Sequence, residues 1–473
     1  MKHYIEPYPH QMEILELSKK ENSLALLWEM GTGKTGATIN IIRNKFNVHK
    51  AILRTVILGP TVTMYNWQKE ISVWSKIPED RVKVITGSGK KRIDSLLEAC
   101  SGDNIIIINW EALINDTVFN LLCDYAPMFL VGDELHYVKS HKSKRSKKAV
   151  KLSDVTRKLG GYVVGLTGTP IINSPEDIFM QYKFLDGGRI FGPNFYTFQK
   201  QYMVNINQGW TGAKSFPKWV PNTARTKELN GKVNRIATRI TKDECLKDLP
   251  PLIKTRRYVE LSKEQLKYYI EMKKDFITYV NSKAVVASMA LTKLQKLLEI
   301  TYGFMKDEEG GFHEFVDNPR LKELENLLLE LTPKHKVIVW ASWKHNYKMI
   351  TRLCDRLKIN YTTLLEKAEA KENVNLFQED PNIRVIVGSR RVGGIGVNLT
   401  AASYSIVFSR NFSFDQEKQS EARNHRGGSQ IHSQIVKIDL VTPKTADERV
   451  LEALENKQNI SDKIIDWSES DGL

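Results

Sequence analysis

Short runs of apolar residues recur through the first part of the chain, with polar or helix-like stretches between them. These runs are Leu24 to Trp28, Thr55 to Leu58, Val82 to Ile85, Ile105 to Ile108, Phe129 to Val131 and Tyr162 to Leu166. A parallel sheet is covered by helices on both faces, so its strands form nearly continuous apolar runs. The alternation of such runs with helical patterns therefore predicts an α/β unit built on a parallel sheet.

The same alternation returns in the second part of the chain. The runs there are Val337 to Trp340, Arg384 to Val387, Ser405 to Phe408 and Ile435 to Leu440. A helical segment, 346–357, lies among them. The economical interpretation is a pair of α/β units in tandem, each with its own parallel sheet.

Between the two units, residues 186 to about 318 lose the strand rhythm and become helical in pattern. Ser262 and Gln265 form a candidate capping box at the start of a helix. The pair Pro250-Pro251 is the candidate hinge, because paired prolines end a helix and stiffen a connection. We therefore expect helical insertions around this hinge.

The chain is basic overall. Its 473 residues include 70 Lys and Arg against 55 Asp and Glu, a formal net charge of +15, which favours a polyanion such as nucleic acid as partner. The four cysteines lie far apart, so neither a disulfide framework nor a zinc ribbon is indicated. Apolar runs stay far below the roughly 20 residues that cross a bilayer, and the first ten residues lack the apolar core of a signal peptide. We expect an intracellular protein without a membrane segment.

A glycine-rich segment directly follows the first apolar run and precedes a helical pattern. Its residues are Met30, Gly31, Thr32, Gly33, Lys34 and Thr35. Glycines let backbone N–H groups surround a phosphate, a lysine reaches the outer phosphates, and a hydroxyl can hold Mg²⁺. The strict pattern has glycine where Trp28 stands, and a chance glycine-rich turn is the alternative. The strand before the segment and the helix after it favour a nucleotide site.

Two carboxylates, Asp133 and Glu134, follow the apolar run at 129–131. A parallel sheet places them at its carboxyl edge, where α/β proteins bind ligands. Hydrolysis of a phosphoanhydride needs one carboxylate near Mg²⁺ and a second to orient and deprotonate water. We assign Asp133 to the metal and Glu134 to the water; an exposed acidic turn is the alternative.

Arginines gather late in the second unit. Gln419, Arg423 and Arg426 fall on one face of a predicted helix. Arginine suits phosphate binding because its planar guanidinium stays charged. An arginine of one unit that reaches ATP on the other would couple hydrolysis to closure, whereas a solvated basic helix is the alternative.

Motifs along nearly the whole chain resemble those of the Swi/Snf family of DNA-dependent ATPases within helicase superfamily two. The segments are YPHQ at 8–11, EMGTGKT at 29–35, GPT at 59–61, NWEAL at 109–113, DELH at 133–136, LTGTP at 166–170, GGIGVNLTAA at 393–402 and RNHRG at 423–427. Leu135 and Arg390 depart from the residues common in the family. On its own, LTGTP is equally well a turn that ends a strand.

The resemblance implies an α/β fold of two RecA-like lobes with helical insertions between them. The implied domains are a first lobe at 1–250 with a helical insertion at about 186–245, a helical protrusion at 251–318, a second lobe at 319–445 and a closing helix at 446–473. The nucleotide is expected between the lobes. Gln11 is expected to read adenine, Gly394 to contact the nucleotide, and Arg423 and Arg426 to be catalytic.

The resemblance also implies that duplex DNA lies across both lobes. The side chains expected to contact it are Thr61, Asn66, Trp67, Asn109, Ser342, Trp343, Arg390 and Asn398. The basic run 139–151, which includes Lys139 and Lys142, is a further candidate for this contact, and a solvated helix is the alternative. Contacts to phosphates carry no sequence readout, which suits a motor that visits every position on DNA.

The main hypothesis is an ATP-driven double-stranded DNA translocase that uses ATP and Mg²⁺. A strand-separating DNA or RNA helicase is the alternative, and a motor subunit with protein partners in a restriction, repair or replication assembly stays open. A non-hydrolysing interaction module would need altered catalytic residues, whereas the loop lysine, both carboxylates and Arg426 are present. Without modules resembling chromodomains or bromodomains, the sequence favours a bacterial or viral setting and a cytoplasmic or nucleoid-associated location.

Overall fold

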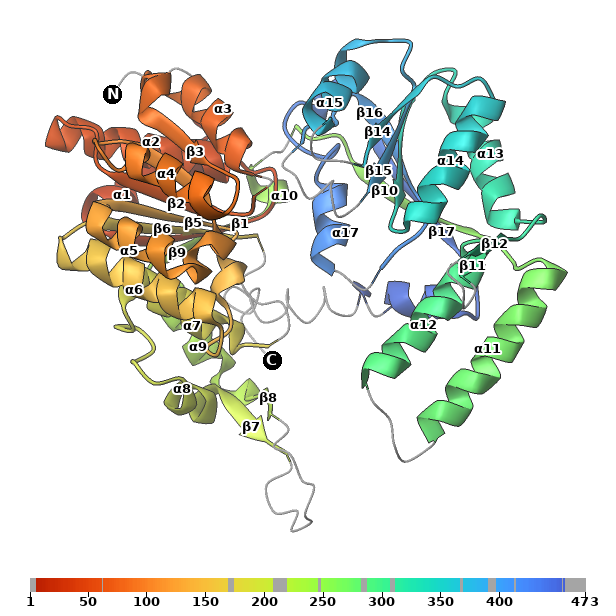
Figure 1. Ribbon diagram of the computed structural model, residues 1–473, viewed down its shortest axis with the longest axis horizontal. Helices are drawn as coiled ribbons and strands as arrows, with labels where there is room; N and C mark the ends of the chain where they lie inside the picture. Colours follow the sequence, from red (N-terminus) through yellow and green to blue (C-terminus); the bar gives the residue numbers. More distant parts are fainter. Residues whose placement is uncertain are drawn as a thin grey trace. The chain divides into compact units, whose positions relative to one another are not determined.

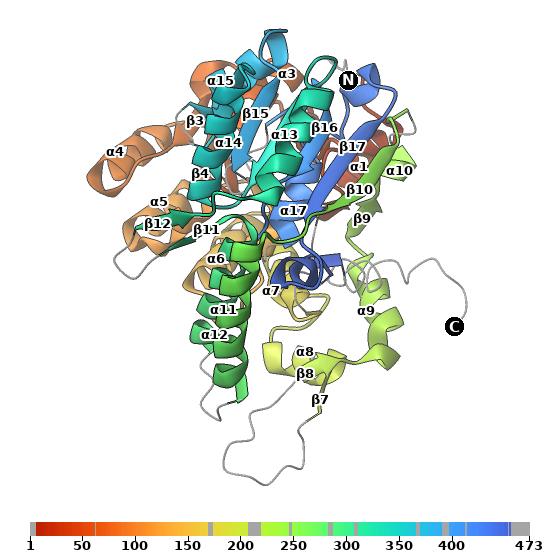
Figure 2. The same ribbon diagram turned by 90° about the vertical axis from the view of Figure 1, so that its right-hand side faces the viewer.

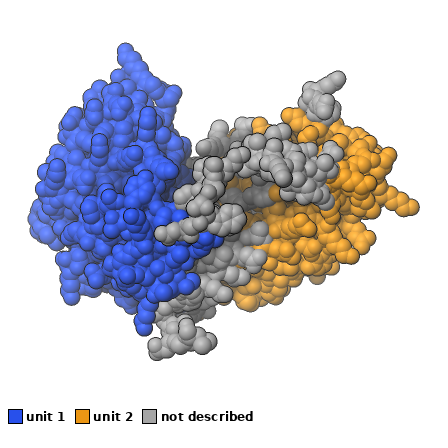
Figure 3. Space-filling model, turned by 90° about the horizontal axis from the view of Figure 1, so that it is seen from below, with its two compact units in different colours: residues 1–247, 459–473 blue, residues 248–458 orange. Residues whose placement is uncertain are grey.

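The computed structural model describes most of the chain in two compact units. The described residues are 6–61, 63–168, 174–206, 219–245, 248–281, 287–306, 311–365, 369–389, 397–411, 414–452 and 454–455. Unit 1 ends at Lys247 and unit 2 begins at Asp248, as the colours of Figure 3 indicate. This division falls just before the Pro250-Pro251 pair.

Unit 1 is built on a seven-stranded parallel sheet with strand order β3-β4-β2-β5-β6-β1-β9 (Figure 1). The strands are β1 (Ser23–Trp28), β2 (Thr55–Gly59), β3 (Val82–Ile85), β4 (Ile105–Asn109), β5 (Phe129–Asp133), β6 (Tyr162–Leu166) and β9 (Ala237–Ile240). The predicted strands of the first part of the chain are confirmed. The prediction lacks β9, which pairs with β1 at the edge of the sheet.

Helices cover both faces of this sheet. They are α1 (Pro9–Lys20), α2 (Lys34–His49), α3 (Met64–Trp74), α4 (Gly89–Ala99), α5 (Asp116–Tyr125), α6 (Lys144–Lys158) and α7 (Asp177–Asp186). Successive residues of a strand point to opposite faces. Leu24 and Leu26 of β1 accordingly pack with α1, α2 and α3, whereas Ala25 and Leu27 belong to the cluster that includes α4 to α7.

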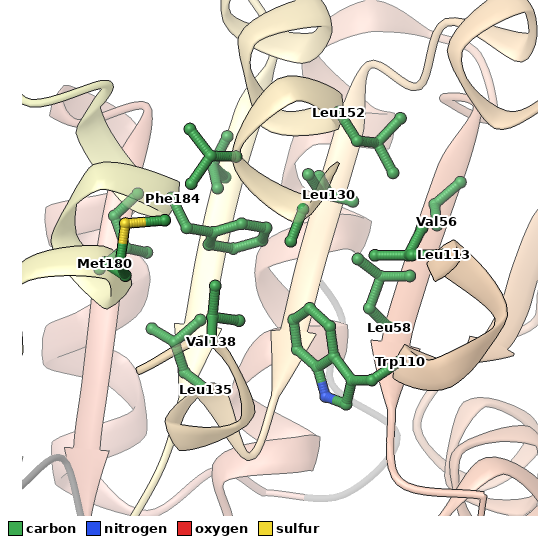
Figure 4. Close-up of a cluster of buried hydrophobic side chains, with 14 of the residues drawn as sticks. Val56, Leu58, Trp110, Leu113, Leu130, Leu135, Val138, Leu152, Met180 and Phe184 are labelled. Atoms are coloured by element: carbon green, nitrogen blue, oxygen red, sulfur yellow. The ribbon is translucent and has the colours of Figure 1, made fainter. Parts of the chain in front are cut away.

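The cluster that contains Ala25 and Leu27 also includes side chains that follow the ends of β4 and β5. In Figure 4, Leu130 of β5 lies among Phe184 of α7, Leu135 and Trp110. Trp110 opens the 3-10 turn η2 (Trp110–Ile114), and Leu135 opens η3 (Leu135–Val138). Buried side chains thus anchor the chain immediately beyond the carboxyl edge of the sheet.

The segment after α7 contains strands as well as helices, where the prediction is helical. Its elements are α8 (Phe195–Tyr202), the antiparallel pair β7 (Met203–Asn205) and β8 (Trp219–Pro221), the 3-10 turn η4 (Thr223–Arg225), α9 (Thr226–Val233), β9 and α10 (Lys242–Cys245). Strand β9 follows α9 and returns the chain to the main sheet. Residues 207–218, between β7 and β8, lie outside the described part.

Unit 2 is built on a six-stranded parallel sheet with strand order β10-β17-β16-β13-β15-β14. The strands are β10 (Leu252–Tyr258), β13 (Lys336–Ala341), β14 (Tyr361–Leu364), β15 (Val385–Ser389), β16 (Ala402–Val407) and β17 (Ile435–Val441). The prediction of a second parallel sheet is confirmed by β13, β15, β16 and β17. The prediction does not include β10 and β14, which form the two edges of this sheet.

The helices of unit 2 are α11 (Lys263–Asn281), α12 (Ala287–Thr301), α13 (Pro319–Leu331), α14 (Lys344–Arg356), α15 (Ala370–Glu379) and α17 (Phe414–Glu421). Helices α11 and α12 run side by side (Figures 1 and 2), and the hairpin β11 (Phe304–Lys306) and β12 (Phe312–Glu314) follows them. The predicted capping box is confirmed: Ser262 N donates to Gln265 Oε1 at 3.1 Å, and Gln265 N donates to Ser262 Oγ at 3.2 Å.

Both faces of the second sheet are also covered. Val337 and Val339 of β13 pack with α13 and α14, whereas Ile338 and Trp340 pack with α15. Residues 446–452 are helical, and their apolar side chains join the cluster around α11 and α12. The predicted closing helix continues to 473, but residues 456–473 lie outside the described part.

In the described part of the chain, helices lack the combination of length and apolar character that a bilayer crossing requires.

Candidate active site

The glycine-rich segment forms the loop between β1 and α2. Gly31 and Gly33 both have φ of +87°, in the left-handed region that glycine adopts without strain. A Cβ at Gly33 would lie 2.5 Å from Gln11 Nε2, so a larger residue would collide there. The loop ends at the first turn of α2, where helix N–H groups lack intrahelical acceptors and favour an anion. These features suit a phosphate cradle.

Lys34 and Thr32 bond to backbone carbonyls before the loop. Lys34 Nζ donates to the carbonyl oxygens of Trp28 at 2.8 Å and Glu29 at 3.2 Å. Thr32 Oγ1 donates to the Glu29 carbonyl at 2.7 Å. The loop therefore has a defined shape that its own side chains maintain, with the Lys34 ammonium at the end of β1.

The first turn of α1 holds the far side of the loop. His10 Nε2 donates to the Thr32 carbonyl at 2.8 Å, and Gln11 Nε2 donates to the Gly33 carbonyl at 2.8 Å. Gln11 Oε1 also accepts from Tyr8 N at 2.9 Å. The structure places Gln11, expected to read adenine, directly on the loop, and it adds His10, which sequence reasoning missed.

The loop is also tied to the last strand of unit 1. Glu29 N donates to the Ile240 carbonyl at 2.8 Å, and Glu29 Oε2 accepts from Lys242 N at 2.9 Å. Trp28 Nε1 donates to Thr238 Oγ1 at 2.8 Å. These bonds join residues more than 200 positions apart, so no local pattern reveals them.

Asp133 stands at the carboxyl end of β5, buried and oriented by two donors. Its Oδ2 accepts from Thr63 Oγ1 at 3.0 Å and from Trp67 Nε1 at 2.9 Å. Burial and the neighbouring charge of Glu134 raise the pKa of Asp133 to about 6, against the lowering influence of Trp67, Thr63 and Lys34. The lysine of the loop is therefore close enough to act electrostatically on this carboxylate.

Trp67 differs from its predicted role. The sequence predicts that Trp67 contacts DNA, but its indole is 1% exposed and donates to Asp133. The side chain lies on the buried face of α3, because a large aromatic group gains most free energy when buried, and its N–H then needs an acceptor. Trp67 therefore positions a carboxylate of the site instead of facing a partner.

Glu134 adopts a backbone conformation that is uncommon for a residue with a side chain. Its φ and ψ are 52° and 58°, and such strained positions are concentrated at functional sites. Its Oε2 lies 3.3 Å from His136 Nδ1, and the same nitrogen lies 3.3 Å from Thr167 Oγ1. The DELH and LTGTP segments thus meet here, although Thr169 and Pro170 lie outside the described residues.

The other DNA candidates of unit 1 differ in exposure. Thr61 and Lys142 are exposed, Asn66 and Lys139 are half-buried, and Asn109 is buried with its Nδ2 on Glu111 Oε2 at 3.0 Å. The basic run is partly neutralised. Its ion pairs are Arg145 with Glu111 at 3.1 Å and Lys148 with Asp116 at 2.7 Å.

The DNA candidates of unit 2 lie at strand and helix ends. Ser342 follows β13 and its N donates to Ser409 Oγ at 3.0 Å. Trp343 precedes α14 and packs at the edge of the cluster around α11 and α12. Asn398 is exposed and its Oδ1 accepts from Thr400 N at 3.2 Å. Two further candidates, Arg390 and Gly394, lie outside the described residues.

The arginines do not share a helix, so the predicted helical face of Gln419, Arg423 and Arg426 is wrong. Helix α17 ends at Glu421, and Arg423 N donates to the Ser420 carbonyl in a turn. The Arg423 carbonyl accepts from Leu399 N at 3.0 Å, so this residue bonds to a segment outside the helix.

The turn that carries the arginines, residues 423–426, is anchored by the side chains of the two residues between them. Asn424 Nδ2 donates to the Ala402 carbonyl at 3.3 Å. His425 Nε2 donates to the Pro250 carbonyl at 3.0 Å, which ties this turn to the first residues of unit 2. We call residues 423–426 the arginine turn.

Two family models match most of the chain. The SNF2-related domain matches residues 12–306, and the helicase conserved C-terminal domain matches residues 319–428. An uncharacterized ATP-dependent helicase of Mycoplasma genitalium is 26% identical over 92% of this chain and 40% of its own length. A Caenorhabditis elegans homolog of the SWI/SNF-related matrix-associated actin-dependent regulator of chromatin subfamily A-like protein 1 is 26% identical over 97% of this chain and 61% of its own.

Among solved structures, the Sulfolobus solfataricus SWI2/SNF2 ATPase core in complex with dsDNA is 22% identical, with a TM-score of 0.45 over 99% of this chain and 94% of that one. The chain spans 40 to 61% of the length of the two relatives named above. The SNF2-related match covers more than half of the chain. The chain therefore belongs to the Swi/Snf family of DNA-dependent ATPases within helicase superfamily two.

Proposed function

We propose that this protein is an ATP-driven double-stranded DNA translocase. The observation that carries the proposal is the carboxyl edge of the first sheet, where Lys34 acts electrostatically on Asp133 and Glu134 follows in a strained turn. A phosphate loop beside a metal-binding acid and a second acid is the arrangement that phosphoanhydride hydrolysis requires.

The residues present fit ATP and Mg²⁺. The left-handed glycines let the backbone approach phosphates closely, and the buried Asp133 carboxylate beside the partly buried Glu134 favours a compensating cation. Mg²⁺ in such sites is held by one or two carboxylates together with phosphate oxygens. Thr35 and Asp133 would hold it here, and when bound it neutralises charge on the phosphate oxygens.

The remaining roles fall to side chains of both units. Glu134 orients the attacking water and accepts its proton, while His136 holds the Glu134 carboxylate in place. Lys34 exchanges its backbone acceptors for the outer phosphates. Arg423 and Arg426 of the arginine turn stabilise the charge of the transition state.

The proposal is tested by the nucleic-acid dependence of ATP turnover. Duplex DNA is expected to stimulate hydrolysis more than single-stranded DNA or RNA of equal length. Displacement of a third strand from a triplex, with no separation of the duplex, is expected for translocation. Stimulation by single strands alone, or release of separated strands, would instead identify a helicase.

DNA binding is expected to weaken steeply with salt, because each neutralised phosphate releases counterions. Lys142, just before α6, and Lys147, in its first turns, are exposed and are candidates for such contacts. Replacing both with alanine is expected to reduce the slope of log K against log salt by about 2. The measurement is fluorescence anisotropy of labelled duplex DNA.

The matched control is the double alanine variant of Lys90 and Lys91, which removes the same charge from exposed positions on α4. An equal loss of slope in both variants would show only a general charge effect. An unchanged slope in the α6 variant would remove this strip from the DNA surface.

Replacing Trp67 with phenylalanine removes the indole N–H from Asp133 Oδ2. Groups that orient a metal ligand typically contribute about 10- to 100-fold to metal affinity. The Mg²⁺ concentration that gives half-maximal ATP turnover is therefore expected to rise by roughly that factor. The control is Trp110→Phe, because Trp110 Nε1 donates to the Asp133 main-chain carbonyl at 2.8 Å. Equal Mg²⁺ requirements in the two variants would contradict the role of Trp67.

A further inference from the structure

Unit 2 contains a chain of ion pairs that the proposed mechanism does not use, and all of its members except the exposed Lys254 are largely buried. In the described part of the unit its members are Lys254, Glu421, Lys437, Glu417, Asp439, Arg410, Asp447 and Arg320. Four of these side chains are cationic and four are anionic, so the charges balance. We call this cluster the ion-pair chain.

Helix α17 is attached to the ion-pair chain by two glutamates one helical turn apart. Lys437 Nζ, on β17, donates to Glu417 Oε1 and lies 3.8 Å from Glu421 Oε2. Lys254 Nζ, on the edge strand β10, lies 2.7 Å from the same Glu421 oxygen. Residues four apart lie on one face of a helix, so both glutamates hold that face of α17 to the sheet.

Both glutamates are largely buried, and Glu421 is held in its charged form. Burial favours the neutral acid, but the charges of Lys437 and Lys254 outweigh it and hold the pKa of Glu421 below its ordinary value. The other end of the ion-pair chain is closed by Arg320 and Asp447, both almost fully buried. Removing Lys437 would leave two acids without their shared partner.

Buried ion pairs contribute little net stability relative to apolar packing, because desolvation offsets their attraction. The presence of buried ion pairs therefore suggests a role other than stability. One documented role is to fix a single geometry of the groups that they join. The geometry at stake here is the end of α17. Arg423 follows Glu421 almost immediately, so a rotation of the last helical turn moves the arginine turn with it.

We propose that Lys437 is a positioning residue for ATP hydrolysis. Through Glu417 and Glu421 it fixes the end of α17, and thereby the direction in which Arg423 and Arg426 point. The proposal rests on the proposed ATPase function, since it concerns how the arginine turn is presented to the nucleotide.

The test compares two lysine-to-methionine variants of unit 2 in DNA-stimulated ATP hydrolysis. Lys437→Met is expected to lower kcat about 10- to 100-fold, because a displacement of about 1 Å has effects of this size. The KM for ATP is expected to stay unchanged, since the phosphate loop is untouched. Lys437→Arg keeps the charge and is expected to restore most of kcat.

The matched control is Lys336→Met. Lys336 lies on β13, and its Nζ donates to the carbonyls of Phe377 and Asp380 at the end of α15, away from α17. This variant is expected to lose thermal stability but to keep its kcat. An equal fall of kcat in both variants would reduce Lys437 to a structural role and overturn the proposal.

A double-mutant cycle with Arg426→Ala separates the proposal from the function on which it rests. If Lys437 acts through the arginine turn, the fall in kcat caused by Lys437→Met is expected to be much smaller in the Arg426→Ala background than in the unaltered protein. Multiplicative losses would overturn the positioning role. If Arg426→Ala itself kept full activity, the assumed role of Arg426 would be wrong, whatever Lys437 does. Should Lys437→Met fail to fold, Glu417→Gln enters the same cycle with the same expectations.

Discussion

Glu134→Gln is expected to lower the rate of ATP hydrolysis by about 10²- to 10⁴-fold, the usual contribution of a general base. Glutamine keeps the size of the side chain but cannot accept a proton from water. ATP binding is expected to persist, because the phosphate loop and Asp133 remain. The measurements are steady-state ATP turnover with saturating duplex DNA and titration calorimetry with ATP.

The control for this variant is Glu98→Gln, an exposed glutamate on α4 whose loss leaves the site intact. Both variants lose one negative charge from unit 1. Full DNA-stimulated turnover in Glu134→Gln would show that another group activates the water. Loss of ATP binding together with turnover would instead assign Glu134 to the shape of the site.

Arg426→Ala is expected to lower turnover by about 10³-fold or more, in line with arginines that stabilise phosphoryl-transfer transition states. Arg426→Lys is expected to recover only part of the loss, because lysine lacks the planar, two-pronged geometry of a guanidinium. ATP affinity is expected to change little. Stopped-flow measurement of phosphate release in single-turnover conditions isolates the effect on the chemical step.

The comparison variant is Arg449→Ala, which removes an exposed arginine of the same unit. A similar loss there would indicate a general effect of charge in unit 2. Turnover that survives in Arg426→Ala but disappears in Arg423→Ala would move the catalytic role to the first arginine of the turn.

The central strands of both sheets could be predicted from the sequence, and several edge strands could not. Strands buried on both faces, such as β4 with Ile105 to Ile108, must be continuously apolar. Strand β10 (Leu252–Tyr258) contains three basic residues. Strands β9 and β14 likewise contain both polar and apolar residues. An edge strand has one neighbour and more solvent, so its composition carries a weaker signal.

The residues proposed to carry out the chemistry could be predicted from local motifs, whereas the residues that hold them in place could not. The phosphate loop and the acid pair each occupy a few adjacent residues after a strand, so their positions at the sheet edge could be predicted. The bonds of Trp67 to Asp133 and of His10 to the loop join distant segments. The turn after α17 bonds to Leu399 N through the Arg423 carbonyl, and no helical pattern contains that contact with another segment.

The passage from unit 1 to unit 2 is tethered on both sides to residues proposed to handle ATP. Lys242, shortly before the passage, is bound to Glu29 at the root of the phosphate loop, and Pro250, just after it, is bound to His425 in the arginine turn. A long, flexible connector would let one unit move in response to nucleotide without moving the other unit. Only residues 243–249 separate these two attachments, so the connector between them is short. Lengthening it with glycine and serine is thus expected to uncouple ATP consumption from motion along DNA.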